Sequence, residues 1–381
     1  MFQRLSSALA PLFLLFAAMT YAAGPMPAPA PPIIGAKSYL IIDGQTGHEL
    51  ALLNPDSALA PASLTKLMTT YVVFDALKQG QIRLEDEATI SEKAWRTEGS
   101  RMFIEVGSRV SIQNLLLGMI VQSGNDASVA LAEHIAGTES VFAELMNQHA
   151  AALGMHSSHF VNATGLPAEG HTTTARDLAT LARAIIAEYP DYYAWHAIKE
   201  FTYNDIKQSN RNSLLWRDAS VDGLKTGHTE DAGYCLVASA RRDNMRIISV
   251  VLGTSSNKAR SDGTQALINY GFRFFETRLL FKAGEEITST RIWKSANESS
   301  RLGVLEDLYI TVRRGSYDQL ESTLDVPTVV EAPISAGQPV AELKIRLGDE
   351  QLLSTPLRAL DDNPTGSVWQ RTRDSVSLWF E

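Results

Sequence analysis

A chain of 381 residues with 45% hydrophobic and 20% charged side chains can bury a large core and is long enough for two domains. Its formal net charge of -9, with no stripe rich in lysine and arginine, argues against a nucleic-acid binder. The single cysteine, Cys235, excludes an intramolecular disulfide, so stability has to come from the core.

The N-terminus has the pattern of an export signal. Residues 1–23 contain Arg4, an apolar segment from Leu9 to Met19, and small residues at the end. The apolar segment is short for a membrane span, which favours a removable signal over an uncleaved anchor. We therefore expect an exported protein whose mature chain begins at about residue 24.

The first candidate catalytic group lies just after a predicted hairpin, whose turn is at residues 43–47. After Pro61, the apolar run at 64–77 repeats at helical spacing and predicts a buried helix with Ser63 in its first turn. Residues three apart on a helix share a face, so the Lys66 amine is expected beside the Ser63 hydroxyl. This pair provides a nucleophile and a candidate base.

A Ser-x-x-Lys spacing alone is weak evidence, because a chain of this length contains about one by chance. A second instance at residues 255–258 follows a strand-like run and has no apolar helix behind it. We interpret that instance as a loop. The argument for Ser63 therefore depends on the groups that accompany it further along the chain.

A second polar cluster lies between two predicted helices. Ser111 has the character of an N-cap for the first helix, and an apolar run at 127–135 predicts the second. Ser123, Gly124 and Asn125 occupy the short connection, where a hydroxyl and an amide can be held rigidly over a cleft. A simple turn without a catalytic role is the alternative.

The next part of the chain is predicted to contain helices and then antiparallel strands. Helical patterns cover residues 142–153, 174–189 and 260–278, strand patterns cover 221–229, 233–240 and 246–253, and the polar stretch 208–217 is predicted to be a loop. The loop carries Arg211, and the first strand carries Lys225, Thr226, Gly227 and His228. A surface turn is the alternative for the Lys-Thr-Gly triplet.

The C-terminal part changes in composition. Residues 24–282 are expected to form one domain, and the short strand patterns at 283–363 predict a small all-β domain. Residues 364–381 predict a terminal amphipathic helix, whose apolar face carries Val368, Trp369, Thr372, Val376, Trp379 and Phe380. Such a helix suits a membrane interface, while docking on its own domain is the alternative.

Three of these motifs occur in one order: Ser63-Leu64-Thr65-Lys66, Ser123-Gly124-Asn125 and Lys225-Thr226-Gly227. The set resembles that of penicillin-binding proteins and serine β-lactamases. The glycine in the middle motif, His228-Thr229 after the third, and Asn210-Arg211-Asn212 look closest to the low-molecular-mass D-alanyl-D-alanine carboxypeptidases of the penicillin-binding protein 5 and 6 type.

The resemblance implies an α+β fold. Its parts would be a penicillin-binding, serine β-lactamase-like transpeptidase domain with an antiparallel sheet flanked by helices, a small C-terminal all-β domain, and a terminal amphipathic helix. It also implies a periplasmic enzyme, peripherally attached to the outer face of the inner membrane, that needs no metal or other cofactor.

The implied reaction removes the terminal D-alanine from peptidoglycan stem peptides, with β-lactam antibiotics as covalent inhibitors. Ser63 would attack the carbonyl between the two D-alanines, and Lys66, with a pKa lowered by burial and by Lys225, would take its proton. Ser123 would pass a proton to the leaving D-alanine. The remaining roles are substrate orientation by Asn125, the oxyanion hole from the N–H groups of Ser63 and His228, and carboxylate binding by Lys225, Thr226 and Arg211.

Two other functions remain open at this point. A serine β-lactamase shares the acylation machinery but also needs fast deacylation, for which Glu169 lies in a segment that does not match the expected loop. A non-catalytic peptidoglycan-binding relative would keep the fold, but degraded motifs would be expected there, and all three motifs are intact.

Overall fold

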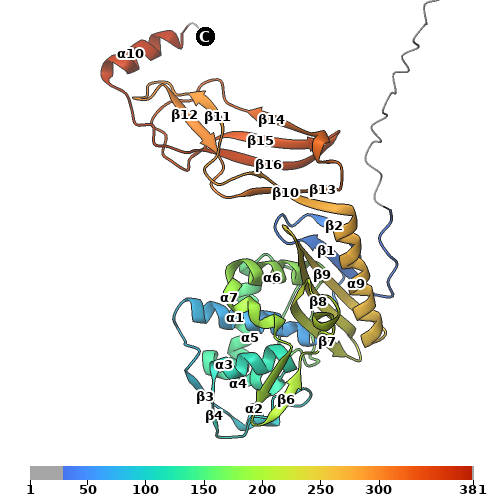
Figure 1. The fold of residues 1–381 in the computed structure, drawn as a ribbon. Helices are drawn as coiled ribbons and strands as arrows, with labels where there is room; N and C mark the ends of the chain where they lie inside the picture. The colour runs from blue at the N-terminus through green and yellow to red at the C-terminus, as the bar shows by residue number, and fades with distance from the viewer. Residues whose placement is uncertain (1–28, 380–381) are drawn as a thin grey trace, which may run out of the picture.

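The computed structural model of the chain describes residues 29–379 (Figure 1). The predicted signal at residues 1–23 lies outside the described residues, as do Phe380 and Glu381. The described chain forms an N-terminal domain and an elongated β domain, with the last helix at the far end of the β domain (Figure 1). This is the α+β architecture that the sequence predicted.

A five-stranded antiparallel sheet runs through the N-terminal domain in the order β2-β1-β9-β8-β7. Its strands are β1 (Ser38–Asp43), β2 (Glu49–Leu53), β7 (Val221–Thr229), β8 (Gly233–Arg242) and β9 (Met245–Thr254). The predicted hairpin is confirmed, because β1 pairs with β2. Side chains alternate between the two faces of a strand, and both faces are covered: Leu40 and Ile42 join one core cluster, whereas Tyr39 and Ile41 join the other.

Helices cover both faces of this sheet. On one face α9 (Asn257–Phe274) packs against β8 and β9, and on the other α6 (Ala175–Glu188) packs against β1 and β9 (Figure 1). Beyond α6 lies a group of helices whose apolar side chains complete the larger core cluster. These are α1 (Thr65–Lys78), α2 (Glu92–Arg96), α3 (Ile112–Leu117), α4 (Asn125–Ala136), α5 (Glu139–Ala152) and α7 (Pro190–Tyr193), with the short helical turns η1 (Ala62–Leu64), η2 (Gly118–Gln122) and η3 (Ala194–Ala197). The short helix α8 (Leu214–Arg217) instead adds Leu214 and Leu215 to the other cluster.

Local capping explains where two of these helices begin. The Ser111 hydroxyl accepts a hydrogen bond from the Asn114 N–H at the start of α3, as the sequence suggested. The Thr174 hydroxyl accepts one from the Asp177 N–H at the start of α6. Two short ribbons, β3 (Glu87–Thr89) with β4 (Arg109–Ser111) and β5 (Glu200–Tyr203) with β6 (Ile206–Ser209), complete the domain.

Several predicted boundaries are wrong. The helix expected at 260–278 runs from Asn257 to Phe274, and β10 follows it directly. The polar stretch 208–217 is not all loop, because it begins at the end of β6 and finishes in α8. The second Ser-x-x-Lys instance is not a loop either: Ser256 caps α9, and Lys258 lies in that helix.

The β domain consists of a ribbon and a second five-stranded sheet. The ribbon pairs β10 (Phe275–Phe281) with β13 (Leu308–Arg313), and the sheet has the order β11-β12-β16-β15-β14. Its strands are β11 (Glu286–Arg291), β12 (Ser299–Gly303), β14 (Leu320–Asp325), β15 (Pro339–Leu347) and β16 (Glu350–Ala359), with the turn η4 (Tyr317–Gln319) before β14. The chain leaves β12 at Gly303 and starts β13 at Leu308.

A chain of hydroxyl groups joins the two domains. The buried carboxylate of Asp43, at the end of β1, accepts a hydrogen bond from the Thr277 hydroxyl at 2.7 Å. The Thr311 hydroxyl lies 2.9 Å from that of Thr277 and 2.7 Å from that of Thr46. The β1–β2 hairpin is therefore hydrogen-bonded directly to the β10–β13 ribbon.

Candidate active site

Ser63 lies in the turn that leads into α1. Residues 62–64 form a single 3-10 turn, and α1 continues from it without a break. The neighbouring side chains of Leu64 and Leu67 are fully buried, so the core fixes the turn in place. Ser63 itself is only half-buried and lines a cavity. The sequence thus places a hydroxyl at the wall of a cleft on a rigid support.

Lys66 is 1% exposed, and its amine has three oxygen neighbours. The Nζ atom lies 3.0 Å from Ser63 Oγ, 2.7 Å from Asn125 Oδ1 and 2.6 Å from the Thr164 carbonyl oxygen. The amide and carbonyl oxygens can only accept hydrogen bonds. A neutral amine therefore donates its two hydrogens to them, and its lone pair faces the Ser63 hydroxyl.

The environment favours that neutral amine. Burial lowers the pKa of Lys66 to about 7, and the positive charge of Arg211 acts in the same direction, while Asp126 opposes it. The sequence prediction of a lowered pKa agrees with this result. Arg211 is a further cation beside Lys66 that the prediction did not name. Burial holds the pKa of Lys225 itself well below its usual value, and Lys66 adds to that effect.

Ser123 and Asn125 lie where η2 ends and α4 begins. Ser123 follows η2 in a left-handed conformation with φ of 68°, and its buried hydroxyl has no hydrogen-bond partner among the described residues. Asn125 is the first residue of α4 rather than part of the connecting loop. Its Oδ1 accepts from Lys66, and its Nδ2 donates to the Glu98 carbonyl at 2.6 Å, which fixes the orientation of the amide.

Sequence reasoning missed two groups that build this side of the site. The buried Asp126 carboxylate accepts hydrogen bonds from the N–H groups of Met102 and Phe103, at 3.0 and 2.9 Å, and holds that segment against α4. An acid in the first turn of a helix was the available signal. The Thr164 carbonyl gave no signal, because every residue has a backbone carbonyl.

Strand β7 forms the other wall of the cleft. Lys225 and Thr226 are buried, and the Lys225 amine donates to the Thr226 carbonyl at 3.1 Å. A Cβ atom on Gly227 would lie 3.1 Å from the Pro61 carbonyl, so a glycine allows β7 to approach the Ser63 turn closely. His228 is exposed, and its ring lies 4.0 Å from that of Tyr234.

The cavity between these walls has a volume of about 550 Å³. Its lining includes Ser63, Ser123, Arg211, Thr226, Gly227, His228 and Arg260. Arg211 is exposed and donates from Nε to the Gln122 carbonyl at 3.2 Å, so its guanidinium lies at the edge of the cleft. The structure therefore brings all nine predicted site residues, from Ser63 to His228, to one cavity and the groups behind it.

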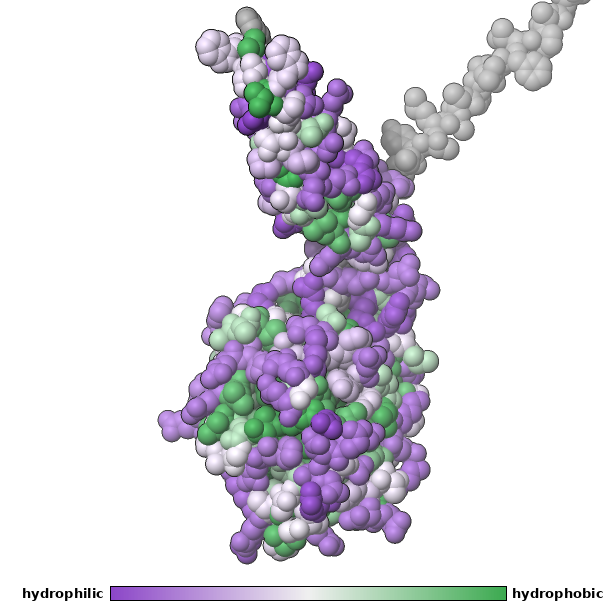
Figure 2. Space-filling view, turned by 90° about the vertical axis from the view of Figure 1, so that its left-hand side faces the viewer, coloured by the Kyte–Doolittle hydropathy of each residue, from purple (hydrophilic) through white to green (hydrophobic). Residues whose placement is uncertain are grey.

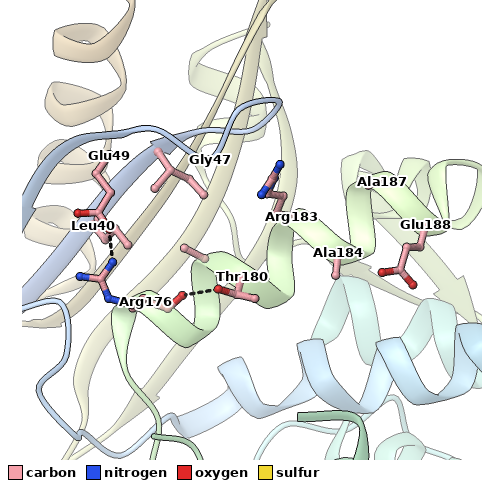
Figure 3. Close-up of a pocket in the computed structure, with 11 residues that line it drawn as sticks. Leu40, Gly47, Glu49, Arg176, Thr180, Arg183, Ala184, Ala187 and Glu188 are labelled. Carbon is pink, nitrogen blue, oxygen red and sulfur yellow. Dashed lines mark hydrogen bonds and ion pairs between the residues drawn. The ribbon is translucent and has the colours of Figure 1, made fainter. Parts of the chain in front are cut away.

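A separate cavity of about 370 Å³ lies between α6 and the β1–β2 hairpin (Figure 3). It shares no lining residue with the Ser63 cavity. Its arginines are occupied: Arg176 pairs with Glu49 and Asp56, and Arg183 donates to backbone carbonyls of the hairpin. It contains no nucleophile beside a buried amine, so the chemistry belongs to the Ser63 cavity.

The alternative of a β-lactamase needs a glutamate that activates water beside the acyl-enzyme. Glu169 is exposed, and within residues 29–379 no hydrogen bond joins it to Ser63 or Lys66. The oxygen that does contact Lys66 from this part of the chain is the Thr164 carbonyl. Among residues 29–379, no glutamate side chain is hydrogen-bonded to Ser63 or Lys66.

Comparison with known proteins identifies relatives over most of the chain. Residues 26–256 match the D-alanyl-D-alanine carboxypeptidase family, and residues 275–365 match the C-terminal domain of penicillin-binding protein 5. The D-alanyl-D-alanine carboxypeptidase DacA of Escherichia coli K12 is 40% identical over 360 residues, which cover 92% of this chain and 89% of that protein.

Solved structures agree with this relationship. Penicillin binding protein 5 from Haemophilus influenzae superimposes with a TM-score of 0.85 at 40% identity, covering 88% of this chain and 99% of that chain. Penicillin-binding protein D2 from Listeria monocytogenes, in its ampicillin-bound form, gives a TM-score of 0.58 at 30% identity over 63% of this chain and 98% of that one. The predicted resemblance and fold class are confirmed.

Proposed function

The chain belongs to the D-alanyl-D-alanine carboxypeptidase family, and from that premise we propose how its own residues act on peptidoglycan stem peptides. The protein is a serine-type peptidase, and its substrate class follows from the family. The observation that supports our assignment of residues is the contact between Lys66 Nζ and Ser63 Oγ at 3.0 Å, with the other two amine neighbours being obligate acceptors.

In the proposed acylation step, Ser63 Oγ bonds to the carbonyl carbon of the penultimate D-alanine, and Lys66 takes the hydroxyl proton. The C–N bond then breaks, and the amine of the terminal D-alanine receives a proton through Ser123, whose unpartnered hydroxyl lines the same cavity. Water later cleaves the resulting ester. General base catalysis of this kind typically contributes 10²- to 10⁴-fold in rate.

The cations of the cleft are proposed to bind the terminal carboxylate. Lys225 and Thr226 supply charge and a donor from β7, and Arg211, next to Gln122, adds a second cation at the edge of the cavity. Because burial lowers the pKa of Lys225, a bound carboxylate would restore its positive charge. Backbone N–H groups of Ser63 and His228 are proposed to stabilise the oxyanion, and the Asn125 amide to orient the substrate.

A labelling and product assay tests the assignment. A fluorescent penicillin should label the protein covalently and stably, Ser63→Ala should abolish the label, and a pentapeptide ending in D-Ala-D-Ala should release D-alanine. Labelling without release would favour a binding protein, and rapid loss of the label would favour a β-lactamase. Ampicillin is bound in the D2 relative, which supports the choice of a penicillin probe.

We also propose that the protein is periplasmic and attached to the outer face of the inner membrane through α10 (Val368–Ser377). Trp369 and Trp379 are 80% and 89% exposed. Figure 2 shows single hydrophobic residues among hydrophilic ones at this end of the molecule. None of the described helices has the length and apolarity needed to cross a bilayer. The polar face of α10 packs on the β domain through Asp374, which leaves the tryptophans free to contact a lipid surface.

Membrane fractionation tests this localisation. Removal of residues 367–381 should move the protein to the soluble fraction without changing its turnover. Replacing Trp369 and Trp379 together by glutamate should give the same redistribution in a full-length chain. An unchanged distribution in both variants would contradict the proposal.

A further inference from the structure

The connection between α5 and α6 supplies the third oxygen neighbour of the Lys66 amine. The Thr164 carbonyl oxygen lies 2.6 Å from Lys66 Nζ, the shortest of the three contacts. Thr164 is buried, yet it lies outside any helix or strand, so no regular hydrogen-bond ladder aims its carbonyl. Something else has to hold this oxygen against the amine.

Asn162 provides that support. Its Oδ1 accepts hydrogen bonds from the Thr164 N–H at 3.1 Å, the Thr164 hydroxyl at 3.0 Å and the Gly165 N–H at 2.8 Å. Its Nδ2 donates to the Leu166 carbonyl at 2.9 Å. Backbone N–H groups on one side and a carbonyl on the other leave one orientation for the amide.

The Gly165 N–H and the Thr164 carbonyl belong to the same peptide group. In a planar trans peptide these two bonds point in opposite directions, so the side chain that captures the N–H also aims the carbonyl. The N–H bond further polarises the peptide and strengthens its oxygen as an acceptor. Asn162 thus acts on Lys66 through one rigid peptide plane.

The segment also packs against the turn at residues 62–64 that carries Ser63. Gly165 has φ of 83°, and a Cβ atom there would lie 1.7 Å from the Ala62 carbonyl oxygen, so the two backbones touch. On the other side, the Thr69 hydroxyl of α1 donates to the Ala163 carbonyl at 2.8 Å. Residues 163–165 therefore contact both α1 and the turn that carries Ser63.

We propose that Asn162 is a positioning residue for the general base: it holds the Thr164–Gly165 peptide so that the Thr164 oxygen takes one hydrogen of the neutral Lys66 amine. With Asn125 taking the second hydrogen, the lone pair of the amine faces the Ser63 hydroxyl. This inference rests on the proposed function of Lys66. It assigns to a side chain without direct substrate contact the task of orienting the proton acceptor.

The test compares the second-order rate constant for acylation by a fluorescent penicillin across a pH series. Asn162→Ala releases the peptide, and a displacement of about 1 Å at a reacting group typically costs on the order of 10²-fold, so we expect a fall of that size. Asn162→Asp keeps the acceptor oxygens but adds a negative charge near Lys66. We expect it to recover most of the rate at high pH and to move the acid limb to higher pH.

Asn147 of α5 offers a matched control, because it supports the same connection from the preceding helix. Its side chain also bonds to backbone, with Nδ2 donating to the Phe160 carbonyl and Oδ1 accepting from the Phe160 N–H, both at 2.8 Å. It has no bond to the Thr164–Gly165 peptide. Asn147→Ala should lower the stability of the segment, but the folded protein should be acylated with the wild-type rate constant.

The outcomes separate this inference from the proposed function. If the wild-type protein takes no penicillin label and Ser63→Ala changes nothing, the proposed function fails first. If the wild type reacts but Asn162→Ala reacts at the wild-type rate, or falls only as far as Asn147→Ala does, the role of Asn162 is refuted. A pH profile of Asn162→Asp that superimposes on the wild type would refute it as well, even if Asn162→Ala did not fold.

Discussion

Two clefts of nearly equal volume differ in how their charges are compensated. The Ser63 cleft measures about 550 Å³, and the cleft between α10 and the β11–β12 hairpin about 580 Å³. Under α10 the buried Asp374 is satisfied by the Lys294 N–H and by Arg373. At Ser63 the buried amines of Lys66 and Lys225 have no carboxylate partner within residues 29–379, and the Ser123 hydroxyl has no partner at all there.

This difference distinguishes a reaction site from a structural joint. Burying a charge or a polar group without a partner costs free energy, so such groups persist where a substrate or a reaction uses them. A satisfied carboxylate such as Asp374 instead holds two elements together. Cleft volume alone does not separate the two cases, whereas the state of the buried polar atoms does.

The variant with the largest expected effect on the Ser63 cleft removes the nucleophile. Ser63→Ala should lower the rate of D-alanine release by on the order of 10⁶-fold, as loss of a nucleophile does in other serine peptidases. The fold should stay intact, because Ser63 is only half-buried. A turnover assay with circular dichroism checks both, and a residual rate within tenfold of the wild type would show that another group attacks the substrate.

Loss of the amine should have the next largest effect. Lys66→Met keeps a long side chain but removes the proton acceptor, and loss of a general base typically costs 10²- to 10⁴-fold. The rate of penicillin acylation measures this directly. A wild-type rate constant in the variant would exclude Lys66 as the base. The corresponding loss in the α10 cleft, Asp374→Ala, should leave the acylation rate unchanged.

The pH dependence of acylation should follow the Lys66 amine. Because its pKa is lowered to about 7, the amine is protonated below that pH and can no longer accept the Ser63 proton. We expect kcat/KM to fall about tenfold per pH unit below pH 7 and to level off above it. A profile that stays flat down to pH 5 would contradict the assignment.

The same shift should appear in stability. The folded pKa of about 7 lies below the ordinary value of 10.5, so between these values the unfolded chain binds more protons and stability rises with pH. Below pH 7 the folded state bears the full free-energy cost of burying the charged Lys66 amine. Between pH 7 and 10.5, Lys66 contributes a slope of up to about 1.4 kcal/mol per pH unit to the free energy of unfolding. Urea unfolding between pH 7 and 9.5 should show a shallower slope for Lys66→Met than for the wild type.

The smallest expected effect concerns the α10 joint. Asp374→Ala removes an acceptor from the Lys294 N–H and from Arg373, which should cost about 1–3 kcal/mol in the docking of α10. Hydrogen exchange at the Lys294 amide should speed up, while exchange around Ser63 stays the same. Unchanged protection at Lys294 would mean that Asp374 does not hold the helix.

Much of the site could be predicted because its residues follow the periods of regular structure. Ser63 and Lys66 are three apart on a helix, and Lys225 lies on a strand bounded by turn residues, so pattern alone placed them. The Thr164 carbonyl could not be predicted, since its position depends on how a connection without regular structure folds over α1. The charge of Arg211 acts on Lys66 through space, which no sequence spacing reveals.

The boundary errors have a similar origin. Phe274 and Phe275 are both apolar, so the helical pattern of α9 continues into the first residues of β10 without a break in hydrophobicity. The transition depends on pairing between β10 and β13, which are separated by more than 25 residues in the chain. Such long-range pairing overrides the local preference.

The hydrogen-bonded groups of Asp43, Thr277, Thr311 and Thr46 fix how the β domain is joined to the N-terminal domain. They tie the end of β1 and the β1–β2 turn to the ribbon that carries the β domain, so the joint between the domains is hydrogen-bonded and is not a bare linker. The β domain then separates α10 from the N-terminal domain by a fixed distance. If α10 anchors the protein as proposed, the length of the β domain sets how far the Ser63 cleft lies from that anchor (Figure 1).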